Sequence, residues 1–202
     1  MINAINRIAT PLRDPSHFQW AIVPMLAFVI YIYAVEIERR NWRTLSAGLA
    51  FYGTEWLAEI ANATWGHFSD TGPLWRTPAD STYVILVGLN IEISLMFAIY
   101  GIVVAKILST VKSRWLVIVG FSVFCAIVEL ILHSWGALTW DHWWWGWPNM
   151  WTVIVFAYAP GTIIAVLAFD SKPTTIKRVS IAALFAIDAT LIGLGVGILG
   201  WI

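Results

Sequence analysis

Residues 50–62 read AFYGTEWLAEIAN and combine a composition suited to lipid with two carboxyl groups and an amide. The stretch lies in an apolar run long enough to cross a bilayer, yet it contains Glu55, Glu59 and Asn62. These positions are separated by four and three residues, so a helix places their side chains on one face. A carboxylate at the bilayer centre costs about 2.5–3.5 kcal/mol on insertion scales. Two acids on one face therefore require a partner, a proton or a chemical task.

The composition of the whole chain is that of a membrane protein. Of its 202 residues, 59% are hydrophobic and 12% are charged, whereas soluble domains contain about 45–50% and about 25%. So few charges cannot cover a water-exposed surface, and the apolar residues fall in runs long enough for bilayer spans. The formal net charge is zero, so we expect the lipid bilayer as the main partner and no nucleic acid.

Six apolar runs predict an all-α bundle of six transmembrane helices in a single domain, with a short extramembrane segment at residues 1–17. The predicted spans are 18–35, 44–65, 82–108, 115–140, 148–169 and 179–202. Pro160 and Gly161 predict a kink in the fifth span. Basic residues gather in the connections after the first, third and fifth spans, at Arg39, Arg40, Arg43, Lys106, Lys112, Arg114, Lys172, Lys177 and Arg178. By the positive-inside rule, these connections are cytoplasmic and both termini lie outside.

The outer side of this predicted bundle is rich in tryptophan. Residues 140–151 read WDHWWWGWPNMW, and Gly146 and Pro148 exclude one continuous helix there. An interfacial belt is the simplest interpretation, because tryptophan prefers the headgroup level. Six tryptophans in twelve residues exceed what anchoring needs. The segment therefore also predicts an aromatic lid over a cavity, or a docking surface for another membrane protein.

Acidic side chains of several predicted helices reach related depths in the membrane. At about 1.5 Å per residue, Glu55, Glu92 and Asp188 lie near the midplane, and Glu59 and Glu129 lie further outward. No lysine or arginine is predicted at those depths. We therefore expect protonated acids, a bound cation or a water-filled cavity among these groups.

Glu129 and His133 are separated by one helical turn and form an i, i+4 pair near the outer boundary. Three interpretations remain open: a hydrogen bond between helices, an acid/base pair, or two ligands of a metal ion. In the metal alternative, Glu55, Glu59 and Glu92 complete the ligand set, and the protein is a metal-dependent membrane oxidoreductase. The sequence alone leaves the cofactor open.

The leading hypothesis is an integral membrane enzyme acting on a lipid-soluble substrate, of the isoprenoid, terpenoid or lipid class. A carboxylic acid in an apolar cavity can protonate an alkene or epoxide, and aromatic faces can stabilise the resulting carbocation. In that chemistry the combination resembles the integral membrane terpene cyclases and the sterol-isomerase type of small helical enzyme, which implies a cyclase or isomerase activity. Glu55 and Asp188 are the predicted proton donor and acceptor.

The remaining polar and aromatic residues receive supporting roles in this hypothesis. Glu59, Glu92, Glu129 and His133 are predicted to tune or relay protons. The predicted substrate-binding residues are Tyr52, Trp56, Asn62, Trp135, Trp140 and Trp144. The alternative from a different class is a non-catalytic small subunit of a membrane complex, with residues 140–151 as its contact surface. A carrier is disfavoured because the chain shows no inverted repeat.

Overall fold

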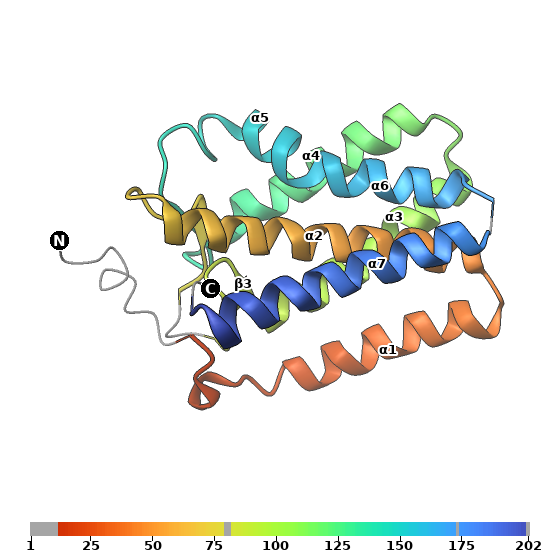
Figure 1. Cartoon of the computed structure of the whole chain (residues 1–202). Coiled ribbons are helices and arrows are strands. Elements are labelled where there is room, and N and C mark those ends of the chain that lie inside the picture. Colours follow the sequence, from red (N-terminus) through yellow and green to blue (C-terminus); the bar gives the residue numbers. More distant parts are fainter. Residues whose placement is uncertain (1–11, 79–81, 173, 201–202) are drawn as a thin grey trace.

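The structure, a computed structural model, describes residues 12–78, 82–172 and 174–200 of the chain, so most of the predicted segment 1–17 lies outside the described residues. Long helices lie side by side along one direction (Figure 1). They are α1 (Ile22–Glu38), α2 (Trp42–Phe68), α3 (Ile91–Thr110), α4 (Arg114–Ser134) and two composite helices. The first composite helix joins α5 (Met150–Thr152), η3 (Val153–Tyr158) and α6 (Ala159–Asp170), and the second joins α7 (Thr175–Ile192) to η4 (Gly193–Ile198).

Four of these helical segments are long and apolar enough to cross a membrane: Ile91–Thr110, Arg114–Ser134, Met150–Asp170 and Thr175–Ile198. The helix α1 has 17 residues, slightly fewer than the roughly 20 that a span needs. The helix α2 has 27 residues but contains the polar face described above. The mostly helical fold of a membrane protein is therefore clear, whereas six spans in one domain remain a proposal.

Two of the predicted helix boundaries are wrong. Residues 82–90 were expected to begin the third span, but β2 (Val84–Leu86) and β3 (Leu89–Asn90) form an antiparallel hairpin there. The helix α3 begins only after Asn90, whose side-chain oxygen accepts a hydrogen bond from the Ile93 amide at 2.7 Å and caps the helix. The predicted fourth span also extends too far, because α4 ends at Ser134 and Gly136 follows with a positive φ of 75°.

The two long connections at the tryptophan-rich end are joined by a short antiparallel pair. Strand β1 (Trp75–Arg76) follows α2, and strand β4 (Thr139–Trp140) follows α4. Trp75 lies opposite Trp140, and Arg76 lies opposite Thr139. An ion pair of 2.7 Å between Arg76 and Asp141 adds to this contact. The pairing fixes both tryptophans over the end of the bundle, where the acidic residues of α2 and α4 lie.

The helix α2 lies at the centre of the bundle and packs against α3, α6 and α7. It approaches α3 closely at Gly48 and Gly101, where a side chain on Gly101 would overlap the Gly48 carbonyl. A π-helical stretch, η3, immediately precedes α6, where a kink was predicted at Pro160 and Gly161. In contrast, the segment Thr175–Ile198, which contains α7, lies at the periphery. In its most apolar stretch of 18 residues, 11% of the residues are buried, against 39–56% for the other three candidate spans.

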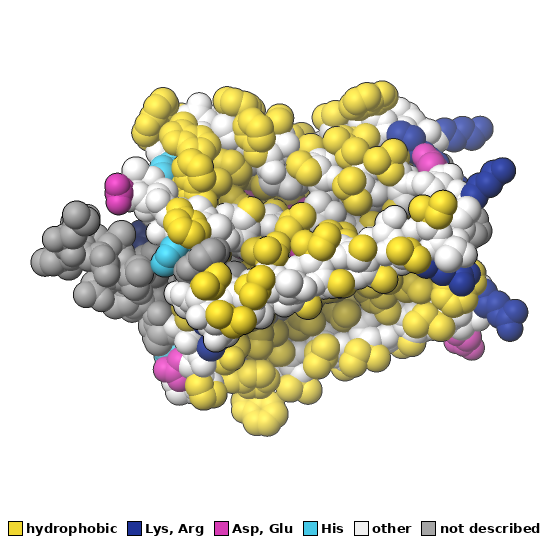
Figure 2. Space-filling view, viewed as in Figure 1, with side chains coloured by type: hydrophobic (Ala, Val, Ile, Leu, Met, Phe, Trp, Pro, Cys, Tyr) yellow, Lys and Arg dark blue, Asp and Glu magenta, His cyan; other side chains and the backbone are white. Residues whose placement is uncertain are grey.

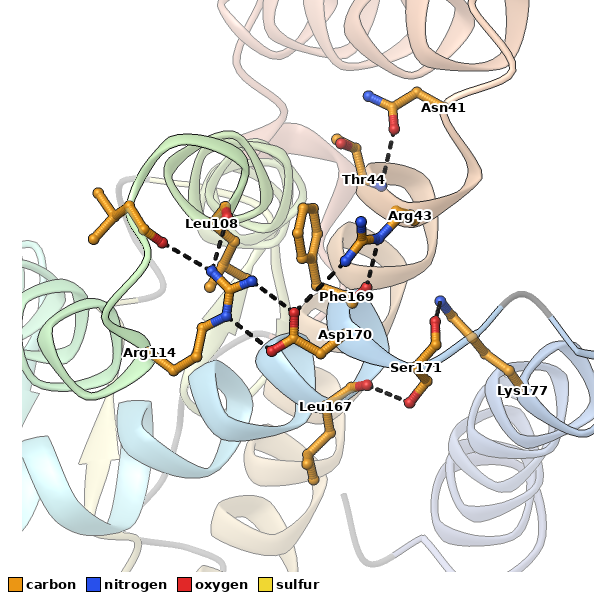
Figure 3. A network of polar contacts seen from close by, with 11 residues as sticks. Asn41, Arg43, Thr44, Leu108, Arg114, Leu167, Phe169, Asp170, Ser171 and Lys177 are labelled. Atoms are coloured by element: carbon orange, nitrogen blue, oxygen red, sulfur yellow. Dashed lines mark hydrogen bonds and ion pairs between the residues drawn. The ribbon is translucent and has the colours of Figure 1, made fainter.

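Lysine and arginine side chains gather at the end of the molecule opposite strand β3 (Figures 1 and 2). Arg114 donates two hydrogen bonds to Asp170, at 2.8 and 2.7 Å. Arg43 donates to the Phe169 carbonyl at 3.0 Å and lies 3.7 Å from Asp170, so this end of α2, α4 and α6 is tied together (Figure 3). This charge asymmetry is the pattern behind the predicted topology; cytoplasmic sidedness of this end remains a proposal.

Candidate acid site

Three carboxyl groups from two helices line one small cavity. Glu55 and Glu59 come from α2, one turn apart, and Glu129 comes from α4. All three side chains are buried, with 3%, 3% and 5% of their surface exposed, respectively. The cavity has a volume of about 20 Å³, which is enough for a single water molecule. The structure thus brings together three of the six residues predicted as catalytic.

The strand pair β1–β4 supplies one indole donor to each of two acids. The Trp75 Nε1–H lies 3.1 and 3.0 Å from the two carboxyl oxygens of Glu59. The Trp140 Nε1–H donates to Glu129 Oε1 at 2.7 Å. Because Trp75 and Trp140 are direct partners in the strand pair, one short ladder positions both donors. The loops therefore cap two buried carboxyl groups that lie on different helices.

Asn62 attaches this cap to the helix that carries Glu55 and Glu59. Its side-chain nitrogen donates to the Trp75 carbonyl at 2.8 Å. Its side-chain oxygen accepts from the backbone amides of Leu74 and Trp75, at 2.8 and 3.4 Å. The shared face predicted for Glu55, Glu59 and Asn62 thus becomes a line of two cavity acids and one structural amide.

Glycines allow the neighbouring backbone to approach the acids. A side chain on Gly88, in the turn between β2 and β3, would lie 2.5 Å from Trp75 Nε1 and 2.6 Å from Glu59 Oε2. A side chain on Gly161 of α6 would overlap Glu55 Oε1. That oxygen is buried and has no hydrogen-bond partner within the described part of the chain. Among the carboxyl oxygens of the three cavity acids, Glu55 Oε1 is the one that is fully buried without a partner in the described part of the chain.

Glu129 has two further aromatic neighbours. Tyr158, from η3, lines the same cavity as Glu129. His133 stacks on Trp140 with ring centroids 4.0 Å apart and planes inclined by 17°. The Nδ1 atom of His133 lies 3.1 Å from the Leu138 carbonyl oxygen. His133 thus supports the tryptophan that binds Glu129 and does not line the cavity itself.

A larger apolar groove lies on the other side of Trp75. It has a volume of about 370 Å³ and shares Ala58 and Trp75 with the acid cavity. Trp75 stacks on Trp145, with ring centroids 5.2 Å apart and planes inclined by 20°, and Trp144 also lines the groove. One indole therefore forms a wall between a ligand-sized apolar groove and a water-sized acidic cavity.

Comparison with known proteins places the chain among membrane proteins. Residues 3–197 match the model of a family described as "Uncharacterized membrane protein family". The chain belongs to this family. A protein of Archaeoglobus fulgidus, described as "Uncharacterized protein", is 37% identical over 207 residues, which cover 98% of each chain. No solved structure matches the chain significantly. Family membership and four apolar helices together show an integral membrane protein.

The structure separates the other predicted catalytic residues of this family member from the acid cavity. Glu92 was expected near the midplane, but it lies in the first turn of α3 and accepts a hydrogen bond from Thr82 at 2.5 Å. The reason is that the preceding residues form a hairpin and not a turn of helix. Asp188 of α7 faces Gly53 of α2. Gly53 is two positions from Glu55, and therefore lies on the opposite side of α2.

The predicted substrate-binding residues are distributed in a similar way. Asn62 and Trp144 line the apolar groove beside Trp75, and Trp140 donates a hydrogen bond to Glu129. The Tyr52 hydroxyl and the Trp56 indole both contact Ser94 of α3, at 3.0 and 3.2 Å, away from the cavity. Trp135 has 78% of its surface exposed. The roles assigned to all these residues stay predictions.

Three of the five proposed metal ligands line the cavity, but they are not arranged as a metal site. Within the described residues, no group of three or more histidine, cysteine, aspartate or glutamate side chains is placed to hold a metal ion. The sequence interpretation also missed Trp75, Tyr158 and Gly88, which complete the cavity. Trp75 lies in a polar connection, and only its pairing with Trp140 brings it to Glu59. The π-helical stretch before Pro160 presents Tyr158, and the Pro160-Gly161 pair was the available signal for that irregularity.

Proposed function

We propose that the protein is an integral membrane enzyme that acts on a lipid-soluble, alkene-containing substrate through Glu55, Glu59 and Glu129. The observation that carries this proposal is the position of Trp75 between the acid cavity and the apolar groove. In this account the groove receives the substrate from the lipid. Displacement of the Trp75 indole then joins the two spaces, because the acid cavity alone holds no more than a water molecule.

The proposed chemistry is acid-catalysed isomerisation or cyclisation. Glu55 gives its proton to an alkene carbon, so that an O–H bond breaks and a C–H bond forms with the π electrons. The resulting carbocation lies near the faces of Trp75 and Trp145, which attract positive charge. Glu59 or Glu129 then takes a proton from an adjacent carbon, and a new double bond forms. The overall step requires no oxidant or reductant.

The environment of the three acids supports this division of roles. The described residues that line the cavity include no lysine or arginine, so three ionised carboxylates there would repel one another without compensation. Glu59 and Glu129 each accept an indole hydrogen bond, which stabilises a carboxylate. Glu55 Oε1 accepts none. Glu55 is therefore the best candidate to hold the proton.

The test compares lipid extracts of cells that contain the native protein with those of cells that lack it. Glu55→Gln preserves side-chain volume and is expected to abolish the difference between the extracts while the helical fold persists. The matched control is Glu38→Gln, because Glu38 is exposed at the C-terminal end of α1, away from the acid cavity. An unchanged product pattern with Glu55→Gln would remove Glu55 from the mechanism. Identical extracts with and without the native protein would contradict the enzyme hypothesis.

One observation favours a second candidate function, that of a non-catalytic subunit in a membrane complex. Trp143, Trp135 and Trp147 have 84%, 78% and 67% of their surfaces exposed at the capped end. Such residues contribute strongly to protein interfaces. In this alternative, Trp143→Ala combined with Trp147→Ala would reduce the size of the complex seen on native gels of solubilised membranes. The enzyme hypothesis expects no change in size.

A further inference from the structure

Another hollow lies at the basic end of the bundle, remote from the acid cavity and from the groove beside Trp75. It is a groove of about 630 Å³ between α2 and α7. Its apolar lining includes Leu45 and Leu49 of α2 and Ile181 and Phe185 of α7. Lys177 and Arg178, in the first turn of α7, line the same groove. The groove thus combines a long apolar surface with two adjacent cations.

Among the described residues, no acidic side chain forms an ion pair with either of these two cations. Lys177 has 9% of its surface exposed, and its Nζ donates to the Ser171 carbonyl at 3.3 Å (Figure 3). Arg178 is exposed and has no ion pair among the residues that the structure describes. The nearby acid, Asp170, is already engaged by Arg114 and Arg43. The groove therefore retains a net positive charge at one end.

We propose that this groove binds an anionic phospholipid. The phosphate lies against Lys177 and Arg178, and one acyl chain lies along Leu45, Leu49 and Phe185. Basic pockets between helices at the cytoplasmic boundary recognise anionic headgroups, and the groove volume falls within the range of ligand sites. Trp42, 45% exposed at the same groove, lies where indoles contact headgroups.

A phospholipid fits this groove better than a second helix does. A helix packed on α7 would have to cover two unpaired cations, and a buried charge without a partner is costly. A lipid phosphate neutralises the cations while its chain covers apolar surface. Only 11% of the most apolar stretch of Thr175–Ile198 is buried, so the apolar surface of α7 is available to lipid. The proposal does not depend on the acid site.

Native mass spectrometry of the full-length protein in detergent tests this proposal, with phosphatidylglycerol and phosphatidylcholine as probes. We expect tighter retention of phosphatidylglycerol. Arg178→Gln should weaken it about fivefold, and the double change with Lys177→Gln about 30-fold, from the usual contribution of each basic residue. Ala182→Trp, which fills the groove, should reduce retention of both lipids. The matched control is Lys172→Gln in the same connection, because Lys172 is exposed and does not line the groove.

Three results would overturn the proposal. One is equal retention of phosphatidylglycerol by the native protein and by Arg178→Gln, whose exposed side chain can be changed without disturbing the fold. Another is displacement of bound phosphatidylglycerol by inorganic phosphate, which would indicate a site for the free anion. The third is a protein dimer without bound lipid that Ala182→Trp dissociates. These experiments measure the amount of bound lipid or the mass of the complex and not enzymatic turnover. Their result is therefore independent of the test of Glu55.

Discussion

Gly88 offers the sharpest test of the cap over the acid cavity. An added methyl group there would meet three polar atoms at once: Trp75 Nε1 at 2.5 Å, Glu59 Oε2 at 2.6 Å and Asn62 Nδ2 at 2.7 Å. All three belong to side chains that are buried and hydrogen-bonded to one another or to the cap. None can move without loss of a contact. We therefore predict that Gly88→Ala separates Trp75 from Glu59.

The expected cost has two parts. Overpacking of a buried site costs about 1–3 kcal/mol, and loss of a hydrogen bond to a buried carboxyl group costs about 1–3 kcal/mol. We expect the free energy of unfolding to decrease by about 3 kcal/mol in total, because relief of the overlap breaks the hydrogen bond and the two costs are not fully additive. For a chain of this size, that corresponds to a fall in Tm of about 6–12 °C.

Gly120→Ala is the matched control, because it is the same substitution with the opposite expected sign. Gly120 lies inside α4, and a methyl group there meets nothing within 4 Å. Alanine in a helix interior is favoured over glycine by about 0.5–1 kcal/mol. Thermal unfolding of the detergent-solubilised protein, followed by tryptophan fluorescence, measures both variants. If Gly88→Ala melts at or above the native temperature, the close packing of the hairpin on Trp75 and Glu59 is refuted.

Three other substitutions test separate parts of the structure. Asn62→Ala removes the hydrogen bonds to Leu74 and Trp75, so we expect a loss of about 2 kcal/mol and faster proteolysis of the loop after α2. Asp188→Leu replaces a buried carboxyl group without hydrogen-bond partners among the described residues, so Tm should rise, and a fall would reveal a partner. Arg114→Lys loses the two-point contact with Asp170, and we expect thermal unfolding to show a loss of about 1 kcal/mol.

The helices could be predicted because each apolar run is long and ends at residues that cap or break a helix. The connection after α1 and that before α4 fall within a few residues of their predicted positions. The hairpin at residues 82–90 could not be predicted in this way. Its apolar residues lie next to the apolar start of α3, and periodicity alone cannot distinguish a short buried strand from one more helical turn. Glu92 was misplaced as a direct consequence.

The geometry of the candidate site was predictable from spacing where its residues lie on one helix. The spacing of Glu55, Glu59 and Asn62 determines their common face, because the helical repeat is fixed. Spacing says nothing about Trp75 and Trp140, which are 65 positions apart and meet only through strand pairing. The same limit applies to Asp188, because spacing does not predict which side of α2 it faces.

The proposed function requires Glu55 to deliver a proton from the acid cavity to a substrate carbon. The most direct measurement incubates the purified protein with the lipid extract in deuterated buffer and follows the product by mass spectrometry. We predict one solvent-derived deuterium in the product formed by the native protein and by Glu38→Gln, and no product with Glu55→Gln. Product formed without deuterium, or equally labelled product with Glu55→Gln, would contradict it.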